Sequence, residues 1–278
     1  MFFDGTLTDP QLDHPEGVAV HRDGSVWCGG ERGQIFRIDP EGTGIEEVAS
    51  TEGFCLGMAF GRNDDLFVCD LKHAAVFRVD TRTGTAELFC GGAPGRPFRI
   101  PNYPAFHADG SLFVSDSHGF GAPGPGVFRV LPDGSASLWF ARDVAFANGL
   151  AVGPDGGHLY VVETFANAVF RIPIHDDGSA GEREEVARLP GAWPDGLAFD
   201  VQGNLYVGCY EPSQVLRIQP GGHVDVLLRE WSAHLLAHPT NIAFRGATMF
   251  TANLGRWHIT SIEVGCTGLP LRRGTASA

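Results

Sequence analysis

The sequence predicts an all-β fold, a six-bladed β-propeller with four antiparallel strands in each blade. The first observation is a short apolar segment that recurs at intervals of 40 to 47 residues, each copy centred on one alanine: Ala19, Ala59, Ala105, Ala151, Ala198 and Ala243. The second is a run of Asp, Asn and Gly after each copy, which is typical of tight hairpins. The third is the 38 glycines in 278 residues, which indicate many turns and therefore many short strands.

The repeats start near residues 16, 56, 102, 148, 195 and 240. In each of them the sequence pattern predicts strands in the same order, beginning with the strand that contains the alanine. A second strand follows the turn and carries an aromatic residue: Trp27, Phe67, Phe113, Tyr160, Tyr206 or Phe250. A third strand comes next, as in 34–39 and 75–80, and a weaker fourth strand closes most repeats, as in 85–90, 135–140 and 223–228. The alternation of period 2 between closely spaced turns excludes a helical solenoid.

The last repeat shows only three evident strands. Residues 2–7 precede the first repeat and read as a strand. We expect them to supply the missing outer strand of blade six, which closes the ring and removes its free edges. No linker or shift in composition divides the chain, so residues 1–278 are expected to form one domain.

Charge and composition exclude several classes of function. With 33 acidic and 20 basic residues the net charge is −13, and no basic block favours nucleic acid or an anionic membrane. No apolar run approaches the ~18 residues that span a bilayer, and the N-terminus lacks the pattern of a signal peptide. We therefore expect a cytoplasmic protein with a small-molecule substrate and no protein partner. Its six cysteines, which form no CxxC pair, are expected to be free thiols.

Residues that match across the repeats are interpreted as structural. The alanines let the inner strands approach the axis, and the aromatic residues fill the gaps between blades. The arginines of five third strands are spread around the ring and cannot converge on one anion: Arg37, Arg78, Arg129, Arg171 and Arg217.

The position three residues before each alanine varies, and it predicts a metal site. Because the inner strands begin at this position, its six copies surround the mouth of the central channel: Glu16, Leu56, Asn102, Asn148, Asp195 and Thr240. Four copies carry carboxylate or carboxamide oxygens, the ligands that Ca²⁺, Mg²⁺ or Mn²⁺ prefer. A divalent cation would also relieve the repulsion between Glu16 and Asp195. The alternative is that Asn-Gly and Asp-Gly are merely turn residues that lead into strands.

A second set of positions lies where the second strands return to the same face. It includes Asp116, Glu163 and Asn253, which either orient the ligands or are solvated strand ends. Loops on this face carry His118, Phe120 and Tyr210, which we expect to wall a pocket for a small organic ligand.

The motifs that begin at Glu16, at Asn148 (NGLAVGPDGGHLYV) and at Pro194 (PDGLAFD) resemble those of the gluconolactonase, senescence-marker-protein and luciferin-regenerating-enzyme family. The resemblance implies a six-bladed propeller with one divalent cation on its axis, Ca²⁺ first, with Zn²⁺, Mn²⁺ or Mg²⁺ as alternatives. It implies Glu16, Asn148 and Asp195 as metal ligands, Asn102 as a residue that binds substrate or a metal-bound water, and Asp195 as the general base or nucleophile.

The chain departs from that family at two places. The lactonases of the family commonly carry an arginine two residues before the asparagine of blade three, where this chain has Ile100. Their acidic substrate-binding residue has no evident match near 117–120. These differences count against a sugar lactone as the substrate, but they are compatible with another lactone or an ester.

The sequence thus predicts a metal-dependent hydrolase of a lactone or ester, in which the cation polarises the carbonyl and Asp195 activates water or attacks directly. Two alternatives share the scaffold. One is a phosphotriesterase or arylesterase that uses the same site. The other is a propeller without catalytic activity that binds a ligand or protein on its open face.

Overall fold

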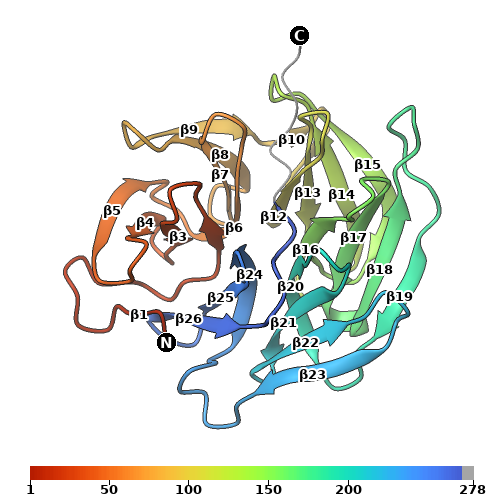
Figure 1. Ribbon diagram of the computed structural model, residues 1–278. Helices are drawn as coiled ribbons and strands as arrows, with labels where there is room; N and C mark the ends of the chain where they lie inside the picture. The colour runs from red at the N-terminus through yellow and green to blue at the C-terminus, as the bar shows by residue number, and fades with distance from the viewer. Residues whose placement is uncertain (271–278) are drawn as a thin grey trace.

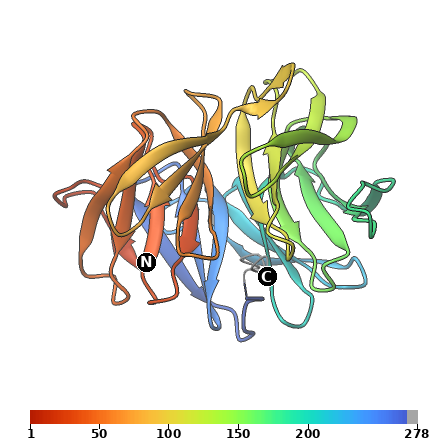
Figure 2. The ribbon, with the colours of Figure 1, turned by 90° about the horizontal axis from the view of Figure 1, so that it is seen from above.

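The computed structural model describes residues 1–270 and confirms the predicted propeller. Six four-stranded antiparallel sheets are arranged in a ring around a central axis (Figure 1). In the view turned by 90°, the strands of the blades extend between the two faces of the ring (Figure 2). Residues 271–278, the end of the expected domain, lie outside the described residues.

The first three blades follow one another along the chain, each with its inner strand first. Blade one consists of β2 (Val18–Val20), β3 (Val26–Gly29), β4 (Gln34–Ile38) and β5 (Ile45–Ser50). Blade two consists of β6 (Cys55–Phe60), β7 (Leu66–Asp70), β8 (Ala75–Asp80) and β9 (Thr85–Cys90). After a small hairpin, β10 (Gly92–Ala93) and β11 (Arg96–Pro97), blade three consists of β12 (Pro101–Phe106), β13 (Leu112–Asp116), β14 (Gly124–Val130) and β15 (Ala136–Val144).

The other three blades repeat this order. Blade four consists of β16 (Ala147–Val152), β17 (His158–Glu163), β18 (Ala168–Pro173) and β19 (Glu184–Arg188), with the 3₁₀ turn η1 (Thr164–Ala166) after β17. Blade five consists of β20 (Trp193–Phe199), β21 (Leu205–Glu211), β22 (Gln214–Ile218) and β23 (Val224–Arg229). Blade six consists of β24 (Pro239–Arg245), β25 (Thr248–Asn253), β26 (His258–Glu263) and β1 (Phe3–Asp4).

The N-terminal strand closes the ring as expected. β1 pairs antiparallel with β26, with Phe3 opposite Ile259 and Asp4 opposite His258, although it is shorter than the predicted 2–7. The inner strand β2 contacts both β6 and β24, so blade one packs between blades two and six. The inner strands therefore form a closed ring around the channel.

The core lies between the blades. The described residues form six buried apolar clusters, one for each pair of neighbouring blades. The second-strand aromatic residues join them as predicted: Trp27 packs edge-on against Phe60 of the next blade at 5.7 Å, and Tyr160 packs against Phe199 at 4.8 Å. Because each cluster needs two blades, the blades stabilise one another and fix the ring that carries the site.

The six repeat alanines all line an apolar cavity of about 380 Å³ on the axis, as expected for small residues on crowded inner strands. Residues 267–270 also line this cavity, at the end of the channel where the inner strands finish. The opposite mouth, where the inner strands begin, is about 10 Å away from the alanines, since three residues of strand separate them.

The recurring arginines pair within their own blades, which confirms their structural interpretation. Arg37 bonds to Glu46 and Asp23, Arg78 to Asp65, and Arg217 to Asp225. All six cysteines are free thiols, as predicted. No helix within residues 1–270 has the length and apolar character needed to cross a membrane.

Five inner strands carry a register shift at the same place, two and three residues before the repeat alanine. In β16 the regular pairing stops at Ala147 and resumes at Leu150, so Asn148 and Gly149 lie in the gap. β6, β12, β20 and β24 have the same irregularity. Such bulges bend a strand and redirect side chains, and they are common beside active sites. The variable position three residues before each alanine falls within them.

The glycine that follows a site residue lets neighbouring inner strands approach closely. A Cβ at Gly149 would lie 2.2 Å from the carbonyl oxygen of Asp195, and one at Gly196 would lie 2.7 Å from the Cα of Asn241. These contacts are with backbone, which cannot move aside as a flexible side chain can. Glycine at these two positions therefore sets the spacing of the inner strands at the mouth.

We predict that Gly149→Ala lowers the free energy of unfolding by about 1–3 kcal/mol, because the added methyl overpacks the mouth. The measurement is urea denaturation followed by circular dichroism. Gly221→Ala is the matched control, since a Cβ there meets nothing within 4 Å, and its effect should stay within about 0.5 kcal/mol. Equal unfolding curves for the two variants would contradict the close approach at Gly149.

Candidate functional site

The residues predicted to surround the channel mouth are buried there. Glu16, Asn102, Asn148 and Asp195 are all less than 8% exposed, although each carries a polar or charged group. The other two copies of this position play different parts. Leu56 packs in the apolar cluster between blades two and three, and the Thr240 hydroxyl donates to the carbonyl oxygen of Glu16 at 2.7 Å.

Asp195 lies at the centre of the hydrogen bonds at the mouth. The amide Nδ2 of Asn148 donates to its Oδ2 at 3.1 Å, and the Nδ2 of Asn241 donates to its Oδ1 at 3.3 Å. Asn241 does not stand out in the repeat because it lies one position after Thr240, inside the bulge of β24. Its side chain, fully buried, takes the place beside Asp195 that the repeat pattern assigned to Thr240.

Two hydroxyl groups orient the asparagines and connect neighbouring blades. Asn102 donates to Ser117 Oγ at 3.0 Å, and Ser117 donates in turn to the carbonyl of Ala147 at 2.7 Å. Asn148 donates likewise to Thr164 Oγ1 at 3.2 Å, and Thr164 donates to the carbonyl of Pro194 at 2.8 Å. Each hydroxyl thus supports the residue directly before the next site residue.

Ser117 and Thr164 are likewise site residues that the repeat comparison does not single out. Both stand four residues after the aromatic residue of a second strand, so the repeat offset that revealed the other sets would have revealed this pair.

The amide oxygens of these asparagines have no donor. Oδ1 of Asn102, Asn148 and Asn241 is buried and lacks a hydrogen-bond partner, although the Nδ2 of each residue is bonded. An unsatisfied buried acceptor costs about 1–3 kcal/mol, so three such acceptors favour a bound ligand or ordered water. A cation suits such atoms, because it needs only acceptors.

The charges at the mouth also favour a cation. Burial raises the pKa of Glu16 well above its usual range, and the charges of Asp195 and Glu31 raise it further. Burial raises the pKa of Asp195 to about 7, against the opposite effect of the hydrogen bonds from Asn148 and Asn241. No Arg or Lys of the part of the chain that the structure describes offsets either charge. The all-oxygen donor set of Glu16, Asn148 and Asp195 therefore fits a hard divalent cation.

The second set of polar residues is buried and structural, so the alternative of solvated strand ends is wrong. Asp116 accepts hydrogen bonds from the backbone N–H groups of Arg99 and Ile100, both at 2.9 Å. Glu163 accepts from the backbone N–H of Ala145 at 2.7 Å, and Asn253 from that of Ala237 at 2.9 Å. Each fixes the segment that leads into its own inner strand, a few residues before the site.

The loop residues predicted to contact substrate lie on two sides of this face. His118 follows β13, and its Nε2 lies 2.9 Å from Arg99 Nη1. Tyr210 lies near the end of β21, stacked on His238 at 4.6 Å. Burial raises the pKa of Tyr210, and the charges of Glu211, Glu16 and Asp195 raise it further. Phe120 is 78% exposed on the same loop as His118.

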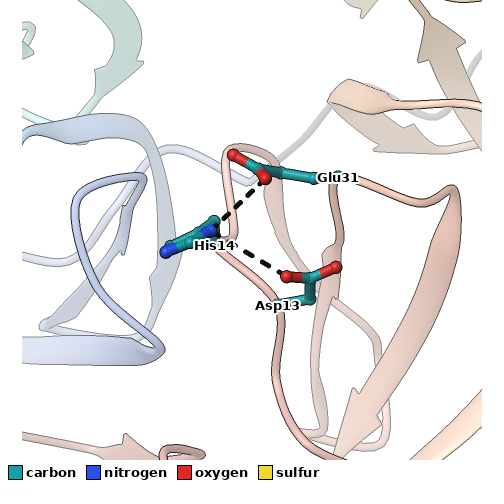
Figure 3. A group of neighbouring side chains, drawn as sticks. All are labelled: Asp13, His14 and Glu31. Carbon is teal, nitrogen blue, oxygen red and sulfur yellow. Dashed lines mark ion pairs between the residues drawn. The ribbon is translucent and has the colours of Figure 1, made fainter.

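A further acidic group lies beside Glu16. In Figure 3 Asp13 and Glu31 point toward His14, whose Nδ1 is 3.9 Å from Asp13 Oδ1 and 3.4 Å from Glu31 Oε2. The possible ligand atoms of the three residues lie within 4.8 Å of one another. Asp13 already accepts from Arg32 Nε at 3.0 Å, so an arginine offsets part of this charge. The cluster adds negative charge to the rim of the mouth, and we assign it no ion.

Fold and site together define a six-bladed propeller with an acidic, oxygen-lined mouth. The chain belongs to the SMP-30/gluconolactonase/LRE-like family, whose model matches residues 43–255, and this confirms the resemblance seen in the sequence. Residues 6–38 also match the N-terminal model of strictosidine synthase-like proteins. The chain is similar to a 6-deoxy-6-sulfogluconolactonase of Pseudomonas putida, with 27% identity over 81% of this chain and 76% of that protein. It is similar to lactonase drp35 of Staphylococcus aureus, with 27% identity over 86% and 78%.

Solved structures share the fold. A gluconolactonase from Xanthomonas campestris superposes with a TM-score of 0.78 at 22% identity, over 94% of this chain and 88% of that one. The calcium-binding protein regucalcin from Agrobacterium tumefaciens superposes with a TM-score of 0.74 at 18% identity, over 93% and 92%.

Proposed function

We propose that this protein is a divalent-metal-dependent hydrolase of a small lactone or ester. The observation that carries the proposal is the set of three buried amide oxygens without donors beside two buried carboxylates. The relatives named as lactonases support the reaction class, and the calcium-binding neighbour supports the cation. Ca²⁺ is the first expectation, with Zn²⁺, Mn²⁺ and Mg²⁺ as alternatives.

Glu16, Asn148 and Asp195 would hold the cation, and the Oδ1 of Asn241 joins them as a candidate ligand. A bound divalent cation supplies a Lewis acid that polarises the carbonyl of the substrate. Asn102, whose buried Oδ1 has no donor, would bind substrate or an ordered water. His118, Phe120 and Tyr210 would contact the remainder of the substrate.

Asp195 acts as the general base in this mechanism. As the oxygen of a water molecule forms its bond to the carbonyl carbon, a carboxylate oxygen of Asp195 takes one proton of that water. The tetrahedral intermediate then expels the ring oxygen, which takes the proton held by Asp195 to give the hydroxy acid and restore the carboxylate. In the nucleophilic variant a carboxylate oxygen of Asp195 bonds to the carbonyl carbon, and the ring oxygen is expelled and takes up a proton from solvent. Water then hydrolyses the resulting mixed anhydride, which releases the hydroxy acid and restores the Asp195 carboxylate. The hydrogen bonds from Asn148 and Asn241 hold the carboxylate in one orientation for either step.

The test combines metal analysis with an assay of acid release. Elemental analysis of the purified protein should find about one divalent cation per chain. A pH indicator should report hydrolysis of one or more compounds in a panel of lactones and aryl esters, and a chelator should abolish that hydrolysis until the cation is restored. Hydrolysis of a phosphotriester alone would instead identify a phosphotriesterase. A metal-free protein that turns over none of the panel would contradict the proposal.

A further inference from the structure

Four aromatic rings form a continuous cluster on the face that carries the site. Phe120 lies 5.0 Å from Phe146, Phe146 lies 4.8 Å from Phe165, and Phe165 lies 6.3 Å from Trp193, all between ring centroids. Phe120 comes from the β13–β14 loop of blade three, Phe146 and Phe165 from blade four, and Trp193 from the start of blade five. We call these four residues the aromatic wall.

Much of the aromatic wall is exposed to solvent. Phe120 is 78% exposed, Trp193 is 47% exposed and Phe165 is 40% exposed, whereas Phe146 is buried beneath them. A contiguous exposed patch of large apolar residues commonly marks a binding surface. The rings also contact one another across three blades, so the wall is a built surface and not a set of isolated side chains.

Each ring is a close neighbour in sequence of a residue of the site. Phe146 precedes Asn148 by two residues, and Trp193 precedes Asp195 by two. Phe165 directly follows Thr164, whose hydroxyl accepts a hydrogen bond from Asn148. Phe120 follows Ser117, the partner of Asn102, by three residues. The wall therefore borders the mouth along blades three to five.

The backbone of Phe146, the buried ring of the wall, is in a strained conformation. Phe146 has φ of 67°, in the left-handed region that bulky residues rarely adopt. Its N–H donates to Val144 O at 3.0 Å, and its carbonyl accepts from the N–H of Thr164 at 3.1 Å, so hydrogen bonds on both sides hold this conformation. Strain of this kind, of order 1–3 kcal/mol, concentrates at functional sites.

We propose that the aromatic wall binds an apolar substituent of the substrate, so that the preferred substrates are lactones or esters with an alkyl or aryl chain. The inference rests on the proposed hydrolase function and names its substrate class. The aromatic faces offer apolar surface to a chain whose reacting carbonyl lies at the mouth. Phenyl rings offer no hydrogen bond to a polyhydroxylated substrate, and the indole N–H of Trp193 offers a single donor. The acidic rim at Asp13 and Glu31 lies on blade one, away from the wall.

The test is a series of γ-lactones that differ only in chain length: γ-butyrolactone, γ-hexalactone, γ-octalactone and γ-decalactone, with glucono-1,5-lactone for comparison. We expect kcat/KM to rise about three- to fourfold for each added methylene that the wall covers. Glucono-1,5-lactone should be hydrolysed more slowly than γ-decalactone. A flat series, or a preference for glucono-1,5-lactone, would overturn the inference while leaving the hydrolase function intact.

Variants test whether the wall is the cause. In the Phe120→Ala/Trp193→Ala double variant, the ratio of kcat/KM for γ-decalactone to that for γ-butyrolactone should fall at least tenfold. Phe120→Leu/Trp193→Phe should keep most of the ratio because it keeps an apolar surface. Trp231→Ala is the matched control, because Trp231 is 80% exposed and its ring packs against Arg229 of blade five. The ratio should not change in this variant. A ratio unchanged in the double alanine variant would overturn the inference.

A binding measurement separates this inference from the hydrolase function. Calorimetry with 5-hexylpyrrolidin-2-one, the lactam analogue of γ-decalactone, should give a dissociation constant at least tenfold below that of pyrrolidin-2-one, and the double alanine variant should lose the difference. This result would support the wall even if no lactone were hydrolysed. Equal affinities for the two lactams would overturn it. A different result would also overturn it: sedimentation that shows a dimer of the wild type and a monomer of the double alanine variant. The wall would then bind a second copy of the chain.

Discussion

Asp195→Asn is expected to lower kcat/KM for the best lactone by about 10³-fold, because removal of a general base typically costs between 10² and 10⁴. The amide of asparagine cannot take a proton from water and is a poor nucleophile. It also removes the charge that Asn148 and Asn241 hold in place. The fold should persist, since the replacement fills nearly the same volume in a buried position whose charge is not stabilised by a basic residue.

The control for this variant is Asp143→Asn. Asp143 is an exposed residue of β15, the strand of blade three that is farthest from the inner strand β12. Replacing it by asparagine should therefore leave kcat/KM within about twofold of the wild type. Both variants should give the wild-type circular dichroism spectrum. Full lactone turnover by Asp195→Asn would show that Asp195 is neither the base nor the nucleophile.

The sequence was enough to predict the propeller because each repeat contains several independent signals of the same blade. The alanine of each inner strand, the aromatic residue of each second strand and the turn between them agree in all six copies, and each has one physical task. Trp27 and Tyr160 fill gaps between blades, and Ala19 and Ala151 line the channel. The extent of β1 was overestimated, because a short edge strand leaves little pattern in two residues.

The site was predicted less completely because it lies where the strands stop being regular. In a bulge two consecutive residues occupy the gap, and the sequence does not say which of them turns toward the mouth. In β16 it is the first, Asn148, but in β24 it is the second, Asn241. The roles of Asp116 and Glu163 were open for a related reason: a carboxylate that accepts backbone N–H groups has no distinctive signal in sequence.

Adding the cognate cation to metal-free protein is expected to stabilise the fold markedly. A ligand that binds only the folded state adds about 2.7 kcal/mol to the free energy of unfolding at a hundred times its dissociation constant. Here the cation would satisfy buried oxygens of Asn148 and Asn241 and offset the charges of Glu16 and Asp195. Calorimetric melting in chelator and then in Ca²⁺, Zn²⁺, Mn²⁺ or Mg²⁺ measures the gain and identifies the cation.

Glu16→Gln should reverse the order of stability with and without that cation. In chelator the variant should melt above the wild type, since it removes a buried carboxyl group whose ionised form is penalised by burial and by the charge of Asp195. In the cation the wild type should melt higher, because the variant has lost a charged ligand. Glu47→Gln, an exposed change on β5, should follow the wild type in both conditions. If none of the four cations raised the melting temperature of the wild type, that result would contradict a metal site at the mouth. A cation that binds only the folded protein must stabilise it.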